Sequence, residues 1–192
     1  MTTVTVVKKD GIAAIAADTL TKWGSAKESA AYISNHEKIL RLGESYIAVT
    51  GTATFKAILR DYFEHTEEEV KLDTPASIFR AWNRLHGALK ERYFLMAEED
   101  KEDALESSRM DCLIANRHGI FGVAAHRTVQ EFSSFYAYGS GSDYALGAMY
   151  SAYGEAGLTA EQIARRGIEA AAEFDDGTGL PITSFTVQLL ST

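Results

Sequence analysis

Apolar and polar positions divide the first fifty residues into short runs, each closed by a glycine or a polar or charged side chain. Four of these runs have the length and composition of β-strands: residues 3–9, 12–17, 38–42 and 45–50. The first two flank Asp10-Gly11, a dipeptide that strongly indicates a hairpin turn. Residues 12–17 are apolar at odd and even positions alike, which is typical of a strand covered on both faces. The pattern predicts two antiparallel strand pairs.

The spacing of apolar residues changes to three and four after Gly51, as on one face of an α-helix. This spacing predicts four helices, over residues 55–63, 78–93, 143–153 and 159–174. Thr74-Pro75 precedes the second helix and supplies an N-cap followed by proline at the first helical position. Thr159 and Gln162 have the spacing of a capping box at the start of the fourth helix.

Further strand-like runs complete the chain: residues 111–116, 120–125, 129–138 and 183–190. The order is therefore strands, two helices, strands, two helices and a strand. Antiparallel strands interrupted twice by helix pairs are best accommodated by two packed sheets with helices outside both. We expect one α+β domain over residues 1–192, folded as a four-layer αββα sandwich of two antiparallel sheets flanked by helix pairs.

Composition narrows the possible functions. Nineteen Lys and Arg against 27 Asp and Glu give a formal net charge of −8, which argues against a nucleic-acid partner. No apolar stretch approaches the roughly 20 residues of a membrane span, so we expect no membrane partner. The single cysteine, Cys112, cannot form an intrachain disulfide and lies in a strand pattern, which indicates a buried structural thiol in a cytoplasmic protein. Without HExxH spacing or a cysteine cluster, we expect no metal and no cofactor.

The N-terminal sequence MTTVTVV suggests a specific chemistry. If Met1 is removed, Thr2 carries a free α-amine beside its hydroxyl. A threonine hydroxyl needs an adjacent base to act as a nucleophile, and an N-terminal threonine carries one on its own backbone. The α-amine has a pKa near 8, so roughly a tenth of it is neutral at pH 7, and a nearby cation would increase that fraction. Such a site requires a buried lysine held by a carboxylate.

Asp18 and Lys38 are candidates for that pair. Asp18 ends an apolar strand, and Lys38 has the parity of Leu40 and Leu42, so its side chain is expected to point inward with them. An inward lysine must be paired or must shift its pKa. The alternative is that both residues are ordinary charges at strand ends. Gly51, directly after a strand, could present its N–H to an oxyanion or could be a simple turn residue.

Six short motifs together carry a resemblance to a known family. They are, in chain order, TTVTVV, AADT, EKILRL, AVTGTA, YGSGSDYALGA and FDDGTG. Their order and spacing resemble the β-subunits of proteasome-type N-terminal-nucleophile hydrolases over essentially the whole chain. Within that group the sequence is most similar to the betaproteobacterial proteasome homologues.

The resemblance implies a role for each residue that matches a family motif. It implies that Thr2 is the nucleophile, that Asp18 and Lys38 form the catalytic pair and that Gly51 supplies the oxyanion donor. Lys27 is the alternative to Lys38, because the stretch before Lys38 is longer than expected. Three further residues correspond to supporting positions of the family: Ser140, Asp175 and Thr178. Asp176 replaces a small residue of the family's pattern and adds a charge beside this group.

The same alignment predicts the substrate cleft. Its expected lining residues are Lys22, His36, Leu40, Val49 and Ala53. Lys22, beside Trp23, stands where proteasome subunits commonly have a threonine that binds the substrate backbone. The resemblance therefore implies a cleft with an altered wall.

These points lead to one main hypothesis and two alternatives. The chain is expected to be a threonine endopeptidase subunit that hydrolyses peptides or unfolded proteins inside a tetradecamer of two stacked heptameric rings. The resemblance implies that an unidentified ATP-dependent unfoldase could serve as its partner. The first alternative is a ring-forming homologue with a vestigial or partner-activated site. The second is an N-terminal-nucleophile amidase that acts on a small amide.

Overall fold

A computed structural model describes residues 2–96 and 104–191 of the chain. Its first strands are β1 (Thr3–Lys9), β2 (Ile12–Asp18), β3 (Thr21–Trp23), β4 (Ala26–Glu28), β5 (Ile39–Leu42) and β6 (Ser45–Val49). Two helices follow, α1 (Thr54–His65) and α2 (Pro75–Glu91). The second half contains β7 (Cys112–Asn116), β8 (Gly119–Val123), β9 (Val129–Phe132), β10 (Phe135–Gly139), α3 (Ser142–Tyr153), α4 (Ala160–Phe174) and β11 (Ile182–Gln188).

The strands form two main antiparallel sheets and one short hairpin. The four-stranded sheet has the order β10-β1-β2-β11, and the five-stranded sheet has the order β5-β6-β7-β8-β9. The predicted hairpin between β1 and β2 is confirmed, with Asp10 and Gly11 at φ values of 50° and 75°. Left-handed backbone at both positions is what a tight hairpin turn requires, and Asp-Gly tolerates it well.

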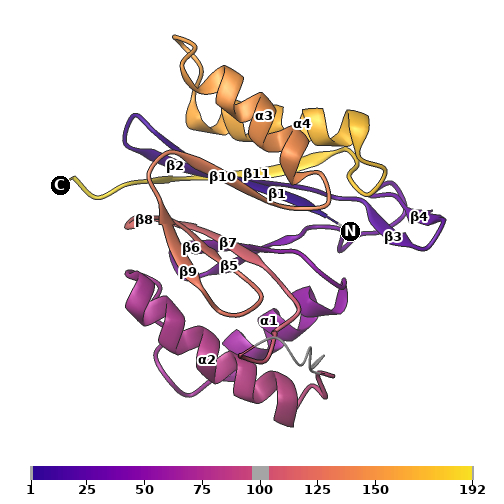
Figure 1. The fold of residues 1–192 in the computed structure, drawn as a ribbon, viewed down its shortest axis with the longest axis vertical. Coiled ribbons are helices and arrows are strands. Elements are labelled where there is room, and N and C mark those ends of the chain that lie inside the picture. Colours follow the sequence, from indigo (N-terminus) through magenta and orange to yellow (C-terminus); the bar gives the residue numbers. More distant parts are fainter. Residues whose placement is uncertain (1, 97–103, 192) are drawn as a thin grey trace.

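Each main sheet has one face against the other sheet and one face against helices (Figure 1). Ala14 and Ala16 of β2 pack on α3 and α4, whereas Ala13 and Ile15 of the same strand pack on the five-stranded sheet. Helices α1 and α2 cover the outer face of the five-stranded sheet, where Trp82 is 1% exposed. This double coverage explains why β2 is apolar at both parities.

The four predicted helices are confirmed, and their starts follow the local signals. Thr74 caps α2 by accepting a hydrogen bond from the Ser77 N–H, with Pro75 as the first helical residue. Thr159 and Gln162 form a reciprocal capping box at α4. No helix within the described residues is both long and apolar enough to cross a bilayer.

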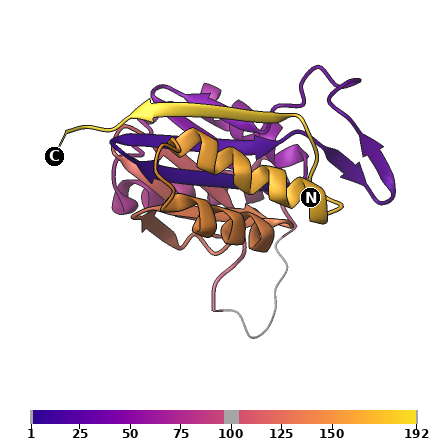
Figure 2. The ribbon, with the colours of Figure 1, turned by 90° about the horizontal axis from the view of Figure 1, so that it is seen from above.

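One strand prediction needs correction, and one hairpin was not predicted. The single strand expected over residues 129–138 is wrong, because β9 pairs with β8 and β10 pairs with β1, in the other sheet. The chain therefore crosses between the sheets at Ser133-Ser134, although β-forming residues flank this pair on both sides. The hairpin of β3 and β4 was not predicted, and Figure 2 shows it extending beyond the sheets at the end where the N-terminus lies.

The thiol of Cys112 is expected to be unreactive in the folded protein. Cys112 is fully buried on β7, and burial raises the pKa of its thiol above its ordinary value, so the reactive thiolate is scarce at pH 8. Iodoacetamide at pH 8 should leave the native chain unmodified and add one group in guanidinium chloride, as counted by intact mass. Rapid labelling of the native protein would contradict this placement.

Candidate active site

The alternation of strand β1 explains the repeated threonines of the N-terminal sequence. Thr3 and Thr5 face the helix layer, where Thr5 Oγ1 donates a hydrogen bond to Ala164 O at 3.0 Å. Val4 faces the other sheet and is fully buried between the two. Thr2 has the parity of Val4, so its side chain is directed to the same side of β1, at the end of the strand.

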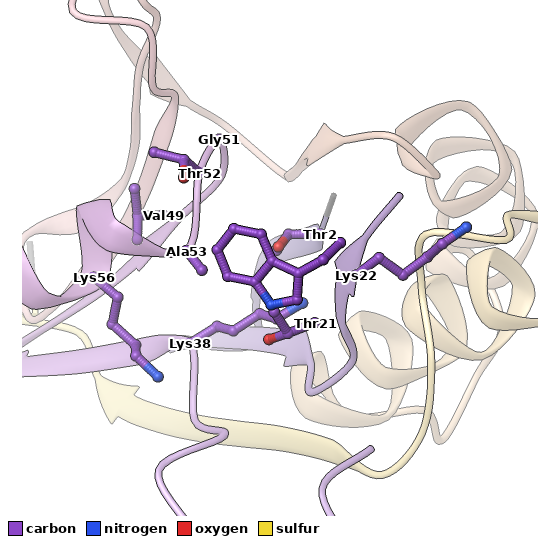
Figure 3. A pocket seen from close by; sticks show the side chains of 10 residues that line it. Thr2, Thr21, Lys22, Lys38, Val49, Gly51, Thr52, Ala53 and Lys56 are labelled. Carbon is purple, nitrogen blue, oxygen red and sulfur yellow. The ribbon is translucent and has the colours of Figure 1, made fainter. Parts of the chain in front are cut away.

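Thr2 lines a pocket at this end of the molecule (Figure 3). Four other segments contribute to its walls: Thr21–Trp23 of β3, Lys38 before β5, Val49 at the end of β6 with Gly51–Ala53 after it, and Lys56 of α1. Thr2 itself is only 6% exposed. Residues that are far apart in the sequence thus meet beside one hydroxyl group. Met1 lies outside the described residues.

The carboxylate of Asp18 is fully buried and accepts four hydrogen bonds. Oδ1 accepts from the Thr3 N–H at 3.0 Å and from Lys38 Nζ at 2.8 Å. Oδ2 accepts from the N–H groups of Leu20 at 3.0 Å and Gly179 at 3.1 Å. Asp18 therefore fixes the backbone next to Thr2 and a buried cation at the same time.

Lys38 is 7% exposed, and its ammonium also donates to Leu20 O at 2.5 Å. Burial lowers the pKa of Lys38, and the charge of Asp18 acts in the opposite direction. Burial likewise raises the pKa of Asp18, whereas Lys38 and the neighbouring N–H donors lower it. Lys27, the alternative partner for Asp18, lies exposed on β4.

A second hydrogen-bond network holds β1 from the side of α4. Thr178 Oγ1 donates to Asp175 Oδ2 at 2.6 Å, so the Thr3 hydroxyl, 2.6 Å from Thr178 Oγ1, is the donor in that contact. Ser140 Oγ donates to the same Asp175 oxygen at 2.7 Å. The Ser140 N–H donates to Thr2 O at 3.0 Å. The structure thus brings Ser140, Asp175 and Thr178 together around the start of the chain.

Gly51 occupies a position that demands glycine. Its φ of 107° lies in the left-handed region, and a Cβ there would lie 2.9 Å from Arg109 O. Any side chain would strain the backbone and displace the segment that borders the pocket. Within the described residues no group accepts a hydrogen bond from the Gly51 N–H, so this donor is available at the pocket rim.

The predicted substrate-binding residues separate into two groups. Lys22, Val49 and Ala53 line the pocket that contains Thr2, but His36 and Leu40 do not. His36 is half-buried, with Nδ1 2.7 Å from Ile33 O. Leu40 is buried and lines a different cavity, together with Leu59 and Phe63.

Lys22 spans the edge of the pocket. Its Nζ forms an ion pair with Asp176 Oδ2 at 2.6 Å, and Lys22 is the main cause of the lowered pKa of Asp176. Asp176 and Lys22 are the two positions expected to differ from the family pattern, and their side chains pair with each other. This contact links β3 to the loop after α4.

Four further residues line the pocket and were not predicted to bind substrate: Thr21, Trp23, Thr52 and Lys56. Thr21 and Trp23 lie on the unpredicted hairpin. Lys56 lies on the face of α1 next to the apolar stripe, and helical spacing alone gave no reason to select it. Within residues 2–96 and 104–191, no cluster of three or more His, Cys, Asp or Glu side chains is suited to a metal ion.

Solved structures of other proteins share the fold described above. No protein-family model and no curated protein sequence matches the chain. A structure of Thiobacillus denitrificans BPH is 65% identical, with a TM-score of 0.95 over 99% of this chain and 100% of that chain. BPH of the same organism in complex with epoxomicin is 64% identical, with a TM-score of 0.93 over 98% and 100% of the two chains.

A more distant match concerns the fold alone. The eukaryotic HslV of Trypanosoma brucei has 17% identity and a TM-score of 0.67, over 97% of this chain and 99% of that one. The two antiparallel sheets with their helix pairs therefore have an HslV-like fold. With about two thirds of its residues identical over their full length, the chain belongs to the bacterial proteasome-like family of Thiobacillus denitrificans BPH.

Proposed function

We propose that the chain is a threonine endopeptidase subunit whose nucleophile, Thr2, is exposed by removal of Met1. One observation carries the proposal. Thr2 lines the same pocket as Lys38, whose ammonium is held 2.8 Å from Asp18 Oδ1, and that oxygen also accepts from the Thr3 N–H. A buried cation beside a mature N-terminus is what an N-terminal threonine requires in order to be active at neutral pH.

The proposed reaction has two stages. The Thr2 hydroxyl attacks a peptide carbonyl while the α-amine of Thr2 takes its proton, and the Gly51 N–H donates to the resulting oxyanion. The amine then returns the proton to the leaving amine, and an ester to Thr2 remains. Water activated by the same amine hydrolyses that ester and regenerates the hydroxyl. No metal or organic cofactor is needed for these steps.

The remaining site residues position the N-terminus. Asp175 accepts from both Ser140 and Thr178, and Thr178 in turn accepts from the hydroxyl of Thr3. Supporting hydrogen bonds of this kind hold a nucleophile in the geometry that the reaction requires. We assign Ser140, Asp175 and Thr178 to positioning of the N-terminus, and Lys22, Val49 and Ala53 to a cleft that binds extended peptides.

The proposal extends to the assembly. The layers correspond to the four-layer αββα sandwich of the N-terminal-nucleophile hydrolases, and the subunits form two stacked heptameric rings in the cytoplasm. Peptides or unfolded proteins are the substrates, and an ATP-dependent unfoldase is the expected partner. Fourteen copies of a 21.0 kDa chain have a mass of about 294 kDa, which light scattering coupled to size exclusion can measure.

Intact mass before and after incubation with epoxomicin tests the nucleophile. The BPH of Thiobacillus denitrificans has been solved with this epoxyketone. We expect loss of Met1, one adduct per chain, and a peptide map that assigns it to Thr2. Thr2→Ala should take no adduct.

The outcome also separates the alternatives. An assembled ring that lacks Met1 but takes no adduct would contradict the peptidase proposal and favour a vestigial or partner-activated site. A monomer that forms the adduct and hydrolyses small amides but not peptides would favour the amidase.

A further inference from the structure

The pocket beside Thr2 is lined by three lysines, Lys22, Lys38 and Lys56, and by no carboxylate among the described residues. Two of these cations are already neutralised. Lys38 is paired with Asp18, and Lys22 is paired with Asp176. Lys56 has no Asp or Glu within ion-pair distance in the described part of the chain. The whole protein carries a net charge of −8, so a positive pocket departs from its average surface.

Lys56 lies in the first turn of α1, and its Nζ donates a hydrogen bond to the backbone carbonyl of Asn35. Burial lowers the pKa of Lys56, and the charges of Arg60 and Lys38 lower it further, whereas Glu37 acts in the opposite direction. Two cations are thus close enough to repel the Lys56 ammonium. An anion in the pocket would relieve this repulsion.

The pocket wall next to Lys56 is formed by small apolar residues and contains no carboxylate, so a substrate side chain could occupy this space. Val49 and Ala53 are small and apolar, and they lie between Thr2 and α1 (Figure 3). Helix α1 begins beside them with no acidic residue in its first turn and no side-chain cap at Ala53. Its N-terminal backbone adds a positive dipole end to the charge of Lys56.

We propose that this pocket accepts a glutamate or aspartate side chain from the residue before the scissile bond, and that Lys56 determines this preference. The inference rests on the proposed function, because Thr2 at the pocket mouth defines which peptide bond is cut. The substrate class is therefore peptides with an acidic residue at that position. Lys38 stays paired with Asp18, so Lys56 is the cation that gains a carboxylate partner when the peptide binds.

Tryptophan fluorescence provides a test that does not depend on turnover. The chain has two tryptophans: Trp23 lines the pocket and is 54% exposed, whereas Trp82 is 1% exposed in the core. N-acetyl tetrapeptide amides that end in Glu, Gln, Leu or Lys and are otherwise identical would be titrated into the assembled protein. We expect the Glu peptide to bind about tenfold more tightly than the Gln peptide, as for a charge-assisted hydrogen bond.

Two variants assign the preference to one residue. Lys56→Gln should bind the Glu and Gln peptides equally, and Lys56→Glu should favour a peptide that ends in Lys. Lys27→Gln is the matched control, since it removes the same charge from the exposed strand β4, outside the pocket lining, and should keep the tenfold ratio. Circular dichroism verifies that each variant is folded.

Three results would overturn the inference: equal binding of the Glu and Gln peptides by the wild type, an unchanged ratio in Lys56→Gln, or no fluorescence response to any peptide. Epoxomicin labelling of Thr2 is measured on the same preparation. An adduct at Thr2 together with any of these results rejects the acidic preference and leaves the peptidase intact. A tenfold preference without an adduct rejects the nucleophile instead.

Discussion

Replacing Lys38 by methionine is expected to slow modification of Thr2 by epoxomicin by at least about tenfold at pH 7, because an α-amine with its ordinary pKa near 8 is only about one tenth neutral there. The ammonium of Lys38 is buried and held 2.8 Å from Asp18 Oδ1, in the pocket that Thr2 lines. A cation close to the α-amine of Thr2 disfavours its protonation, so the free base is available at neutral pH. The measurement is the second-order rate of adduct formation by intact mass.

The loss of rate must be separated from a loss of stability. Lys38→Met leaves Asp18 fully buried with only its three N–H donors, and breaking a buried pair from one side costs about 3–5 kcal/mol. Lys38→Met combined with Asp18→Asn removes the orphaned charge and should recover part of the melting temperature while remaining slow. A folded Lys38→Met protein that reacts at the wild-type rate would exclude Lys38 from the chemistry.

The pH profile gives the sign of the electrostatic effect. Under the proposed mechanism the Lys38 ammonium lowers the pKa of the Thr2 α-amine, so the wild type should already react fast at pH 7. Without Lys38 that pKa returns toward its ordinary value near 8, and the rising limb of the profile moves to higher pH. An upward shift therefore supports electrostatic tuning, whereas a uniform loss at every pH points to misplacement of Thr2.

Local signals were enough to predict most of the elements. Asp10-Gly11 fixed the turn between β1 and β2, and Thr74-Pro75 indicated the start of α2. These signals work because the preferred backbone of a few adjacent residues decides the structure there. The doubly apolar pattern of residues 12–17 added the information that this strand is covered on both faces.

The strand predictions failed where contacts between residues far apart in the sequence determine the structure. Residues 129–138 have continuous β-propensity, but their two halves pair in different sheets, and no local residue states which strand will be the partner. The β3–β4 hairpin has strands of three residues, mostly exposed, so it shows no apolar period. The same hairpin contributes Thr21 and Trp23 to the pocket, so the lining predicted from the sequence lacked these two residues.

In the candidate site, too, local sequence patterns predicted some residues, whereas residues placed by tertiary packing were missed. Parity with Leu40 and Leu42 predicted an inward Lys38, and the structure places its ammonium on Asp18. Parity cannot reveal that Lys56 reaches the same pocket, because α1 meets the sheet through tertiary packing. His36 and Leu40 were assigned by alignment alone, and the structure places both outside the lining of this pocket.

Gly139 at the end of β10 is expected to be at least as important for the reactivity of Thr2 as Lys38 is, although it has no side chain. Gly139 pairs with Thr3 across the sheet and has a φ of 108°. A Cβ at this position would lie 1.8 Å from Thr2 O and 2.8 Å from Thr2 C. No rotamer change can relieve a contact with backbone, so Gly139→Ala must move the start of β1.

Gly139→Ala should reduce the rate of Thr2 modification more severely than it reduces the stability of the fold. Left-handed strain at alanine costs about 1–3 kcal/mol, and displacement of a nucleophile by about 1 Å costs on the order of 10²-fold in rate. Gly139→Ala should therefore remain folded at low temperature yet react with epoxomicin at least about 10²-fold more slowly.

Gly157 offers a matched control, because its φ is 85° and a Cβ there meets nothing within 4 Å. Gly157→Ala introduces left-handed strain without the contact to Thr2, so it should lose some stability and keep the wild-type rate of adduct formation. If both variants react at that rate, the close approach of Gly139 does not position Thr2. If both are slow, general loosening of the fold is responsible. A slow Gly139→Ala beside a fast Gly157→Ala would show that the site depends on backbone fit at Thr2.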